Sequence, residues 1–138
     1  MGRTILGMLV GVVMMWLTIA TFEFLGHAVF PPPPGLDPTN REHLQQIIAA
    51  ASVGSLAMLV LGWVAGTFVG GWVAARIARH ARAAAIAVAL FVMASVARMM
   101  MIIPEHPGWV ATLGLLLPIP VALTAATLAG RREKTLPK

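Results

Sequence analysis

Four long apolar segments, separated by short polar stretches, constrain this chain more than any other feature of its sequence. They span residues 4–30, 47–75, 83–103 and 109–130. A helix needs about 20 mainly apolar residues to cross the roughly 30 Å hydrocarbon core of a bilayer, and each segment reaches that length. Backbone polar groups in lipid must be bonded within their own segment, which favours helices. The sequence therefore predicts an all-α fold, a four-transmembrane-helix bundle in a single transmembrane domain (1–138), with helices at about 4–30, 43–76, 82–103 and 108–130.

The 138-residue chain is too apolar for a soluble domain, because 59% of its residues are hydrophobic and 11% are charged. Ordinary globular chains have about 45–50% and about 25%, and a domain this short cannot bury so large a surplus of apolar surface. The lipid bilayer is therefore its expected surrounding. The net charge of +5 lies in short clusters at the ends of the apolar segments, which argues against nucleic acid as a partner. The chain has no cysteine, which excludes disulfides and thiolate metal sites.

The positive charges indicate how the chain is oriented in the membrane. Of the ten Lys and Arg residues, only Arg41 and Arg98 lie outside the N-terminus, the loop between the second and third segments, and the C-terminal tail. Because Lys and Arg accumulate in cytoplasmic loops, we expect both termini on the cytoplasmic side (N-in/C-in). The first segment is longer than the roughly 7–15-residue apolar core of a signal peptide and lacks a convincing cleavage site, so we expect it to be retained as a helix.

The first outer loop is rich in proline. Four consecutive prolines at 31–34 cannot continue a helix and predict a stiff polyproline II strut about 12 Å long. Thr39, with Glu42 three residues on, is a helix-start signal. The following residues are too hydrophilic to lie in lipid. Segment 38–52 is therefore either a short interfacial helix or an outer extension of the second transmembrane helix.

Small residues recur at four-residue spacing along the second transmembrane segment, and again at Gly7 and Gly11 in the first. The helix-packing glycines of the second segment are Gly54, Gly62, Gly66 and Gly70. Such a stripe lets the backbone of another helix approach closely, and we expect it to pack the protein against a second copy or a membrane-protein partner. In the fourth segment, Pro118 and Pro120 should kink the helix in mid-membrane.

Three ionisable side chains lie inside the apolar segments: Glu23, His27 and Arg98. The positions of Glu23 and Arg98, eight residues before Pro31 and six before Pro104, place them about 12 Å and about 9 Å below the outer boundary. His27 is one helical turn above Glu23 on the same face. Because charges in a bilayer are costly, we predict that Glu23 and Arg98 meet inside the bundle with His27 close by. The cluster is either a proton or ion site or an ion pair that fixes helix register.

The remaining polar groups indicate no catalytic, metal or cofactor site. Asp37, Glu42, His43, Glu105 and His106 fall on the outer side without the spacing of metal ligands, and we interpret them as solvated loop residues. The sequence contains no Gly-x-Ser-x-Gly, His-Glu-x-x-His or phosphate-loop motif. We therefore expect no enzymatic activity, no cofactor and no bound metal.

Three short motifs carry a family resemblance. The stretch from Gly26-His27 to the proline loop ending at Asp37, the glycine-rich run at 61–70, and Leu-Ala-Gly-Arg at 128–131 resemble a group of uncharacterised small bacterial four-helix membrane proteins with a PPPxG-x-D first outer loop. The resemblance implies a multi-pass protein of the bacterial cytoplasmic (inner) membrane and transfers no functional residue. A more distant similarity is to the small multidrug transporters, which have four short helices and a membrane glutamate in the first. Glu23 would match it, although it is displaced toward the outer side and the proline loop is foreign to that family.

These patterns favour one function and leave a second open. The strongest signals are packing signals, so we expect a non-catalytic scaffold or accessory subunit that packs through its glycine-rich helix with itself or with a partner. The alternative is a small proton- or ion-coupled transporter that uses Glu23, His27 and Arg98.

Overall fold

The computed structural model describes residues 1–37, 39–104 and 106–131. Within these residues, all regular secondary structure is helical. The helices are α1 (Gly2–Val29), α2 (Arg41–Ala49), α3 (Val53–Ile77), α4 (Ala81–Ile102), α5 (Gly108–Leu116) and α6 (Pro118–Arg131). Four stretches are long and apolar enough to cross a membrane, namely α1, α3, α4 and the combined stretch Gly108–Gly130.

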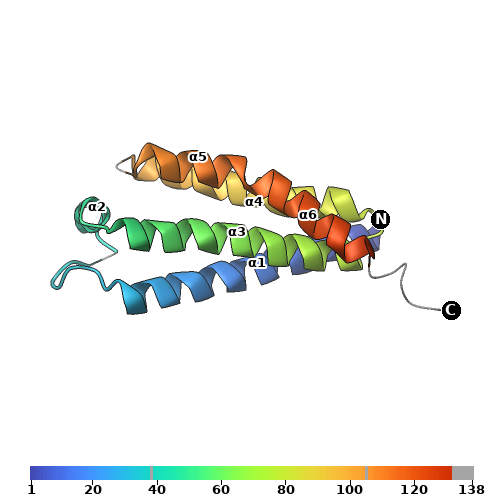
Figure 1. Cartoon of the computed structure of the whole chain (residues 1–138), viewed down its shortest axis with the longest axis horizontal. Coiled ribbons are helices and arrows are strands. Elements are labelled where there is room, and N and C mark those ends of the chain that lie inside the picture. The colour runs from blue at the N-terminus through green and yellow to red at the C-terminus, as the bar shows by residue number, and fades with distance from the viewer. Residues whose placement is uncertain (38, 105, 132–138) are drawn as a thin grey trace.

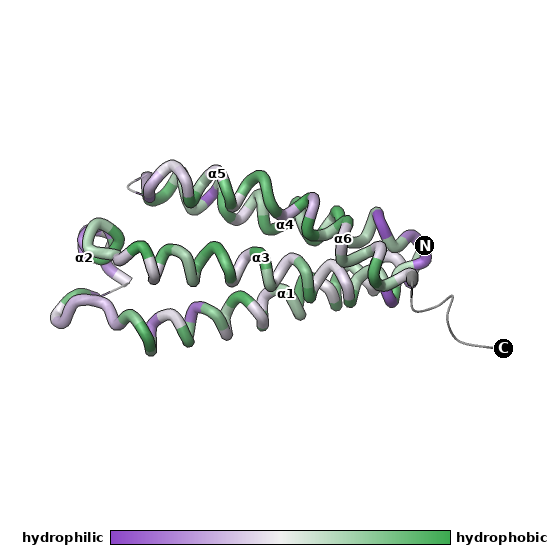
Figure 2. The backbone as a smooth tube through the Cα atoms, viewed as in Figure 1, coloured by the Kyte–Doolittle hydropathy of each residue, from purple (hydrophilic) through white to green (hydrophobic). Residues whose placement is uncertain are grey.

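The helices form an elongated bundle in which α3 makes the most extensive contacts, packing on α1, α4, α5 and α6. The N-terminus and the end of α6 lie together at one end, which we call the terminal end (Figure 1). The connection from α1 through α2 to α3 lies at the opposite end, the α2 end. Hydrophobic positions dominate the length of the helices, and hydrophilic ones gather mainly at the two ends (Figure 2). This distribution suits a bundle whose long axis runs across a bilayer.

The segment expected as one helix over 43–76 is two helices. α2 ends at Ala49, and α3 starts at Val53 after Ser52, whose side chain accepts a hydrogen bond of 3.2 Å from the Ser55 backbone N–H. The open choice for 38–52 is thus resolved in favour of a separate short helix. Its N-cap is Asn40, whose side chain accepts from the Glu42 backbone N–H at 2.9 Å, so the helix start assigned to Thr39 is wrong by one residue.

The last apolar stretch is broken where the prolines lie. α5 ends at Leu116 and α6 starts at Pro118, so the expected interruption of 108–130 at the prolines is confirmed. Proline has no N–H, so the carbonyls four residues before Pro118 and Pro120 lose their helical donors. Pro118 itself is fully buried, which places the break inside the bundle.

The core follows from small residues at the helix contacts. Around Gly7, Gly11 and Gly70, α1 meets α3 with almost no side chain between the two backbones. A second cluster, on α3, α4 and α6, consists almost wholly of alanine: Ala75, Ala85, Ala89, Ala122, Ala126 and Ala129. Larger core side chains follow one face of α4, with Val88, Val92 and Val96 all buried. Close packing of this kind holds helices together where lipid supplies no hydrophobic driving force between them.

Candidate functional site

The glycine stripe of α3 packs against α1 of the same chain. An added Cβ at Gly62 would lie 2.9 Å from the Phe22 side chain, and one at Gly66 would lie 2.6 Å from Ile19. Gly54 meets Phe30 in the same way. The expected helix-packing role is therefore present, but it is used within the chain. A second copy or a partner, which we expected on this stripe, would have to dock elsewhere.

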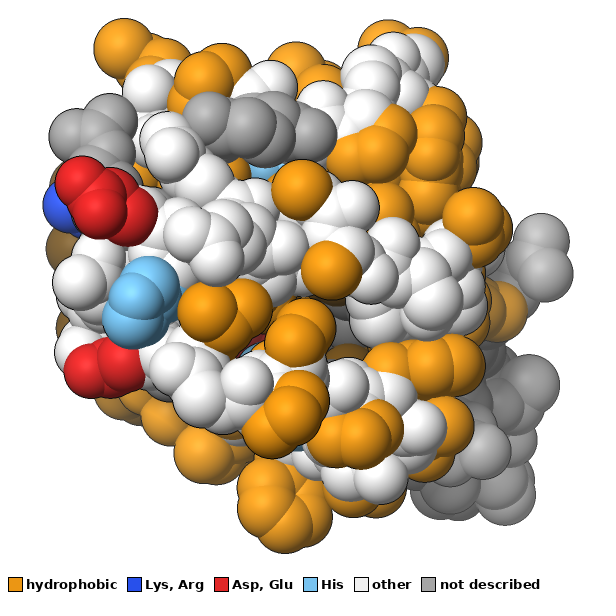
Figure 3. Space-filling model, turned by 90° about the vertical axis from the view of Figure 1, so that its left-hand side faces the viewer, with side chains coloured by type: hydrophobic (Ala, Val, Ile, Leu, Met, Phe, Trp, Pro, Cys, Tyr) orange, Lys and Arg blue, Asp and Glu red, His pale blue; other side chains and the backbone are white. Residues whose placement is uncertain are grey.

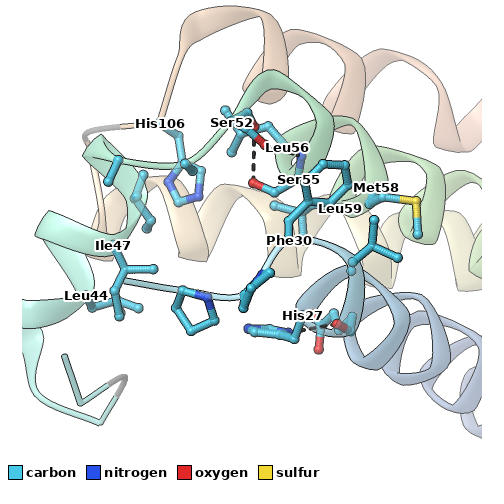
Figure 4. A pocket seen from close by; sticks show the side chains of 18 of the residues that line it. His27, Phe30, Leu44, Ile47, Ser52, Ser55, Leu56, Met58, Leu59 and His106 are labelled. Carbon is cyan, nitrogen blue, oxygen red and sulfur yellow. Dashed lines mark hydrogen bonds between the residues drawn. The ribbon is translucent and has the colours of Figure 1, made fainter. Parts of the chain in front are cut away.

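A cavity of about 490 Å³ lies at the α2 end, and we call it the outer cavity. Apolar residues of α2 and the end of α1 form much of its wall, with Leu44, Ile47 and Phe30 among them (Figure 4). Its polar groups come from α1, the start of α3 and the connection between α4 and α5: Glu23, His27, Ser52, Ser55 and His106. Ser52 and Ser55 are bonded to each other at the start of α3, where the Ser55 hydroxyl donates to the Ser52 carbonyl at 3.1 Å.

Two histidines lie on opposite walls of the outer cavity (Figure 4). The Nδ1 of His27 is 2.7 Å from the Glu23 backbone carbonyl, and that of His106 is 3.0 Å from the Ile103 carbonyl. A carbonyl oxygen only accepts, so Nδ1 donates in each of these bonds and Nε2 of each ring remains available for a further hydrogen bond. The cavity therefore offers a carboxyl group and two ring nitrogens to a ligand with polar groups.

A smaller hollow of about 180 Å³ continues along the side of the bundle between α1 and α4, and we call it the α1–α4 groove. Trp63 forms part of its lining, Trp16 contributes from α1, and Ser95 contributes from α4. Glu23 and Met99 border both the groove and the outer cavity. Glu23 thus lies where the two hollows adjoin, part of the way along the bundle from the α2 end.

The predicted pairing of Glu23 with Arg98 inside the bundle is wrong for the single chain. Both side chains are exposed, and neither forms an ion pair with any described residue. The physical reason is helix rotation. The buried face of α4 includes Val92 and Val96, and a residue two positions after Val96 is turned by about 200° around the helix axis. His27 does lie beside Glu23, as expected, but through the backbone carbonyl of Glu23.

Asp37 organises a turn in the first loop. The Asp37 carboxylate accepts from the Thr39 hydroxyl at 2.7 Å and from the Thr39 backbone N–H at 2.8 Å. These bonds, with a smaller contribution from His43, hold the pKa of Asp37 below its ordinary value of 3.8. The Asp37 backbone N–H donates to His43 Nδ1 at 3.0 Å. Acidic and histidine side chains gather at one edge of this end of the molecule, while apolar side chains cover much of the remainder (Figure 3).

No metal centre emerges in the part of the chain that the structure describes. Over residues 1–37, 39–104 and 106–131, no group of three His, Asp or Glu side chains lies close enough together to hold an ion. Glu42 and His43 lie on α2, and His106 faces the outer cavity. Glu105 lies outside the described residues. The interpretation of these groups as independent loop residues misses His106, whose ring belongs to the same cavity as His27.

One further sequence pattern, which our predictions did not include, indicates the outer cavity. Leu44, Ile47 and Ile48 are spaced three and four residues apart in an otherwise polar segment, which indicates an apolar helix face. All three line the cavity in the structure. The pattern could have predicted that α2 is a separate helix whose apolar face lines a cavity, rather than an extension of α3.

The terminal end has its own small set of contacts. The guanidinium of Arg76 lies 4.7 Å from the centre of the Trp72 ring, a cation–π contact one helical turn along α3. The Thr4 hydroxyl lies 3.4 Å from His80 Nδ1, which ties the start of α1 to the loop between α3 and α4. These contacts hold the helices together at this end of the bundle.

The four spans and their packing define an all-helical, multi-pass membrane protein. No protein-family model, curated protein or solved structure matches the chain. The resemblance to small bacterial four-helix membrane proteins, with the inner-membrane location it implies, stays a prediction.

Proposed function

We propose that this chain is a non-catalytic membrane protein that acts as a scaffold or accessory subunit and associates laterally with itself or another membrane protein. One observation carries the proposal: Glu23 and Arg98 lie exposed on apolar helices, and neither has an ion-pair partner among the described residues. A charged side chain inside the hydrocarbon core is costly, by up to about 2.5–3.5 kcal/mol at the centre of a transmembrane helix. A neighbouring protein surface with complementary charges offsets that cost, whereas lipid tails do not.

The proposed location is the bacterial cytoplasmic membrane, with both termini and the α3–α4 loop inside. Arg3, Arg76, Arg79 and Arg82 support this orientation, because all belong to the end of the bundle at which the N-terminus lies. The α2 end would then face outward. A reporter fused after residue 138, and another inserted in 31–37, test this orientation. The proposal requires the first on the cytoplasmic side and the second outside.

Mass spectrometry of native complexes extracted together with their lipids tests the scaffold role. The proposal expects stoichiometric complexes that contain two or more copies of this chain or one copy with a membrane protein. A chain that is monomeric at all protein-to-lipid ratios and carries no protein partner would contradict it.

A second function is supported by the two adjoining hollows. Glu23 borders both the outer cavity and the α1–α4 groove, and His27 lines the cavity one turn away. We propose as the alternative a small carrier that couples an amphiphilic cation to protons. The carboxylate would bind the cationic head and the apolar walls would hold the tail.

Uptake of a lipophilic cation into liposomes separates the two functions. The carrier proposal expects uptake that depends on a proton gradient and that Glu23→Gln abolishes. Glu42→Gln is the matched control, since Glu42 lies on α2 and does not line either hollow. Uptake that is absent, or that survives Glu23→Gln, would leave the scaffold function alone.

A further inference from the structure

We propose that the lateral partner is a second copy of this chain, and that Glu23 of each copy pairs with Arg98 of the other across a twofold axis parallel to the membrane normal. The inference rests on the proposed scaffold function and gives it a surface: the outer face of the α1–α4 groove. It explains why two opposite charges lie exposed on one small transmembrane domain.

Glu23 and Arg98 lie at similar depth in the bundle. Glu23 lies six residues before the end of α1 at Val29, and Arg98 lies four residues before the end of α4 at Ile102. At 1.5 Å per residue these positions are about 9 Å and about 6 Å from the helix ends. Both helices end at the α2 end of the bundle. A twofold axis along the membrane normal keeps every residue at its own depth, so only residues at matching depths can meet across it.

The two charges also flank the same groove. Glu23 borders the α1–α4 groove from α1, and Ser95 lines it from α4. Arg98 is three residues after Ser95, so it lies on the neighbouring part of the same side of α4. A twofold interface must be self-complementary, since each surface meets an identical copy of itself. A patch with one negative and one positive group at similar depth is self-complementary. In the dimer it forms two equivalent pairs, one on each side of the twofold axis.

Other neighbours satisfy the patch less well. An anionic lipid headgroup would neutralise Arg98 and leave Glu23 without a cation. A copy inserted in the opposite orientation would place its charges in the other half of the bilayer. The exposed Trp16 of the groove, at 64%, supplies apolar contact area beside the charges. A second copy in the same orientation is the occupant that matches both charges.

Charge reversal tests the pairing, with dimerisation measured by energy transfer between labelled copies in lipid bilayers. Glu23→Arg alone would place two positive groups at each contact, and Arg98→Glu alone two negative groups. We expect each single variant to lose the dimer. A mixture of the two variants should recover it, because a chain with arginine at both positions then faces a chain with glutamate at both, and each contact again pairs opposite charges. Recovery in the mixture also shows that both variants fold.

The doubly reversed chain and three control variants complete the design. The double variant should dimerise like the unmodified chain, and Glu23→Asp and Arg98→Lys should keep most of the dimer because they keep the charges. Glu42→Arg, a reversal on α2 outside both hollows, should leave dimerisation unchanged.

The outcomes that overturn the inference differ from those that overturn the scaffold function. If the double variant recovers but the mixture does not, the pair forms within one chain and the inference fails. If the unmodified chain dimerises and the single variants dimerise equally well, another surface is used and only the inference fails. If the unmodified chain is monomeric but holds a different membrane protein, the inference again fails alone. A monomer with no protein partner removes both.

Discussion

Gly11 of α1 and Gly70 of α3 bring their two helix backbones into direct contact. A Cβ added at Gly70 would lie 2.5 Å from the Gly11 carbonyl oxygen, and one added at Gly11 would lie 2.7 Å from the Gly70 carbonyl oxygen. Below 3.0 Å something must shift, and here the neighbouring atoms belong to rigid helical backbone. This contact lies in the half of the bundle near the termini, whereas the outer cavity that Glu23 borders lies at the α2 end.

Substitution at this contact should weaken the bundle. Gly70→Ala forces α1 and α3 apart, and overpacking of this kind typically costs about 1–3 kcal/mol. Gly130→Ala is the matched control, because Gly130 also lies in a helix and an added Cβ there meets nothing within 4 Å. Unfolding in mixed detergent micelles measures the difference. Equal stability of the two variants would contradict the close approach of α1 and α3.

The break between α5 and α6 should depend on Pro118 and Pro120. The double variant Pro118→Ala/Pro120→Ala restores N–H groups that can donate to the Gly114 and Leu116 carbonyls, so the two helices should join into a straighter one. Spin labels on cysteines introduced at Trp109 and Leu128 can follow this change, since the chain has no native cysteine. The distance between the labels should increase. An unchanged distance would mean that packing rather than the two prolines holds the bend.

The turn at Asp37 should respond to pH. Because hydrogen bonds from Thr39 lower the pKa of the folded-state carboxyl below 3.8, the turn gains stability above the unfolded pKa and loses it as the pH falls through the folded pKa. Thr39→Val removes the hydroxyl donor and should raise the pKa of Asp37 toward its ordinary value. Carbon-13 NMR titration of the Asp37 carboxyl measures it. A titration unaffected by Thr39→Val would mean that this hydroxyl does not stabilise the carboxylate.

The four spans are readable from the sequence because their signal is local: length and hydropathy need no knowledge of the rest of the fold. The interruption of the last span is equally local, since Pro118 removes its own N–H. The break before α3 is harder to place. It depends on Ser52 capping a new helix and on Leu44 and Ile47 finding apolar surface to cover, and that surface belongs to distant parts of the chain.

The candidate site shows the limit of depth arguments. Counting residues places Glu23 and Arg98 at similar depth, but it leaves open which way each helix is rotated about its axis. The valines at 88, 92 and 96 mark the buried face of α4, and Arg98 lies away from that face. Three valines spaced four residues apart are a weak signal of the buried face in a helix that is apolar nearly all round. The expected ion pair inside the bundle is therefore absent, and both charged side chains are exposed instead.

The central claim is that two copies meet through Glu23 and Arg98, and cysteine cross-linking between differently tagged copies tests it most directly. One chain carries Glu23→Cys and the other Arg98→Cys, so the mixed dimer keeps one Glu23–Arg98 pair intact while the two cysteines face each other at the second contact. Because the chain has no other cysteine, a cross-link that joins the two tags joins positions 23 and 98. The account predicts that a short bifunctional maleimide, which spans the gap left when the long Glu and Arg side chains are replaced by cysteine, gives a cross-linked dimer containing both tags in bilayers. It predicts far less product when Arg98→Cys is replaced by Leu61→Cys, which is exposed on α3 outside the groove. No mixed dimer, or equal yields from both combinations, would contradict it.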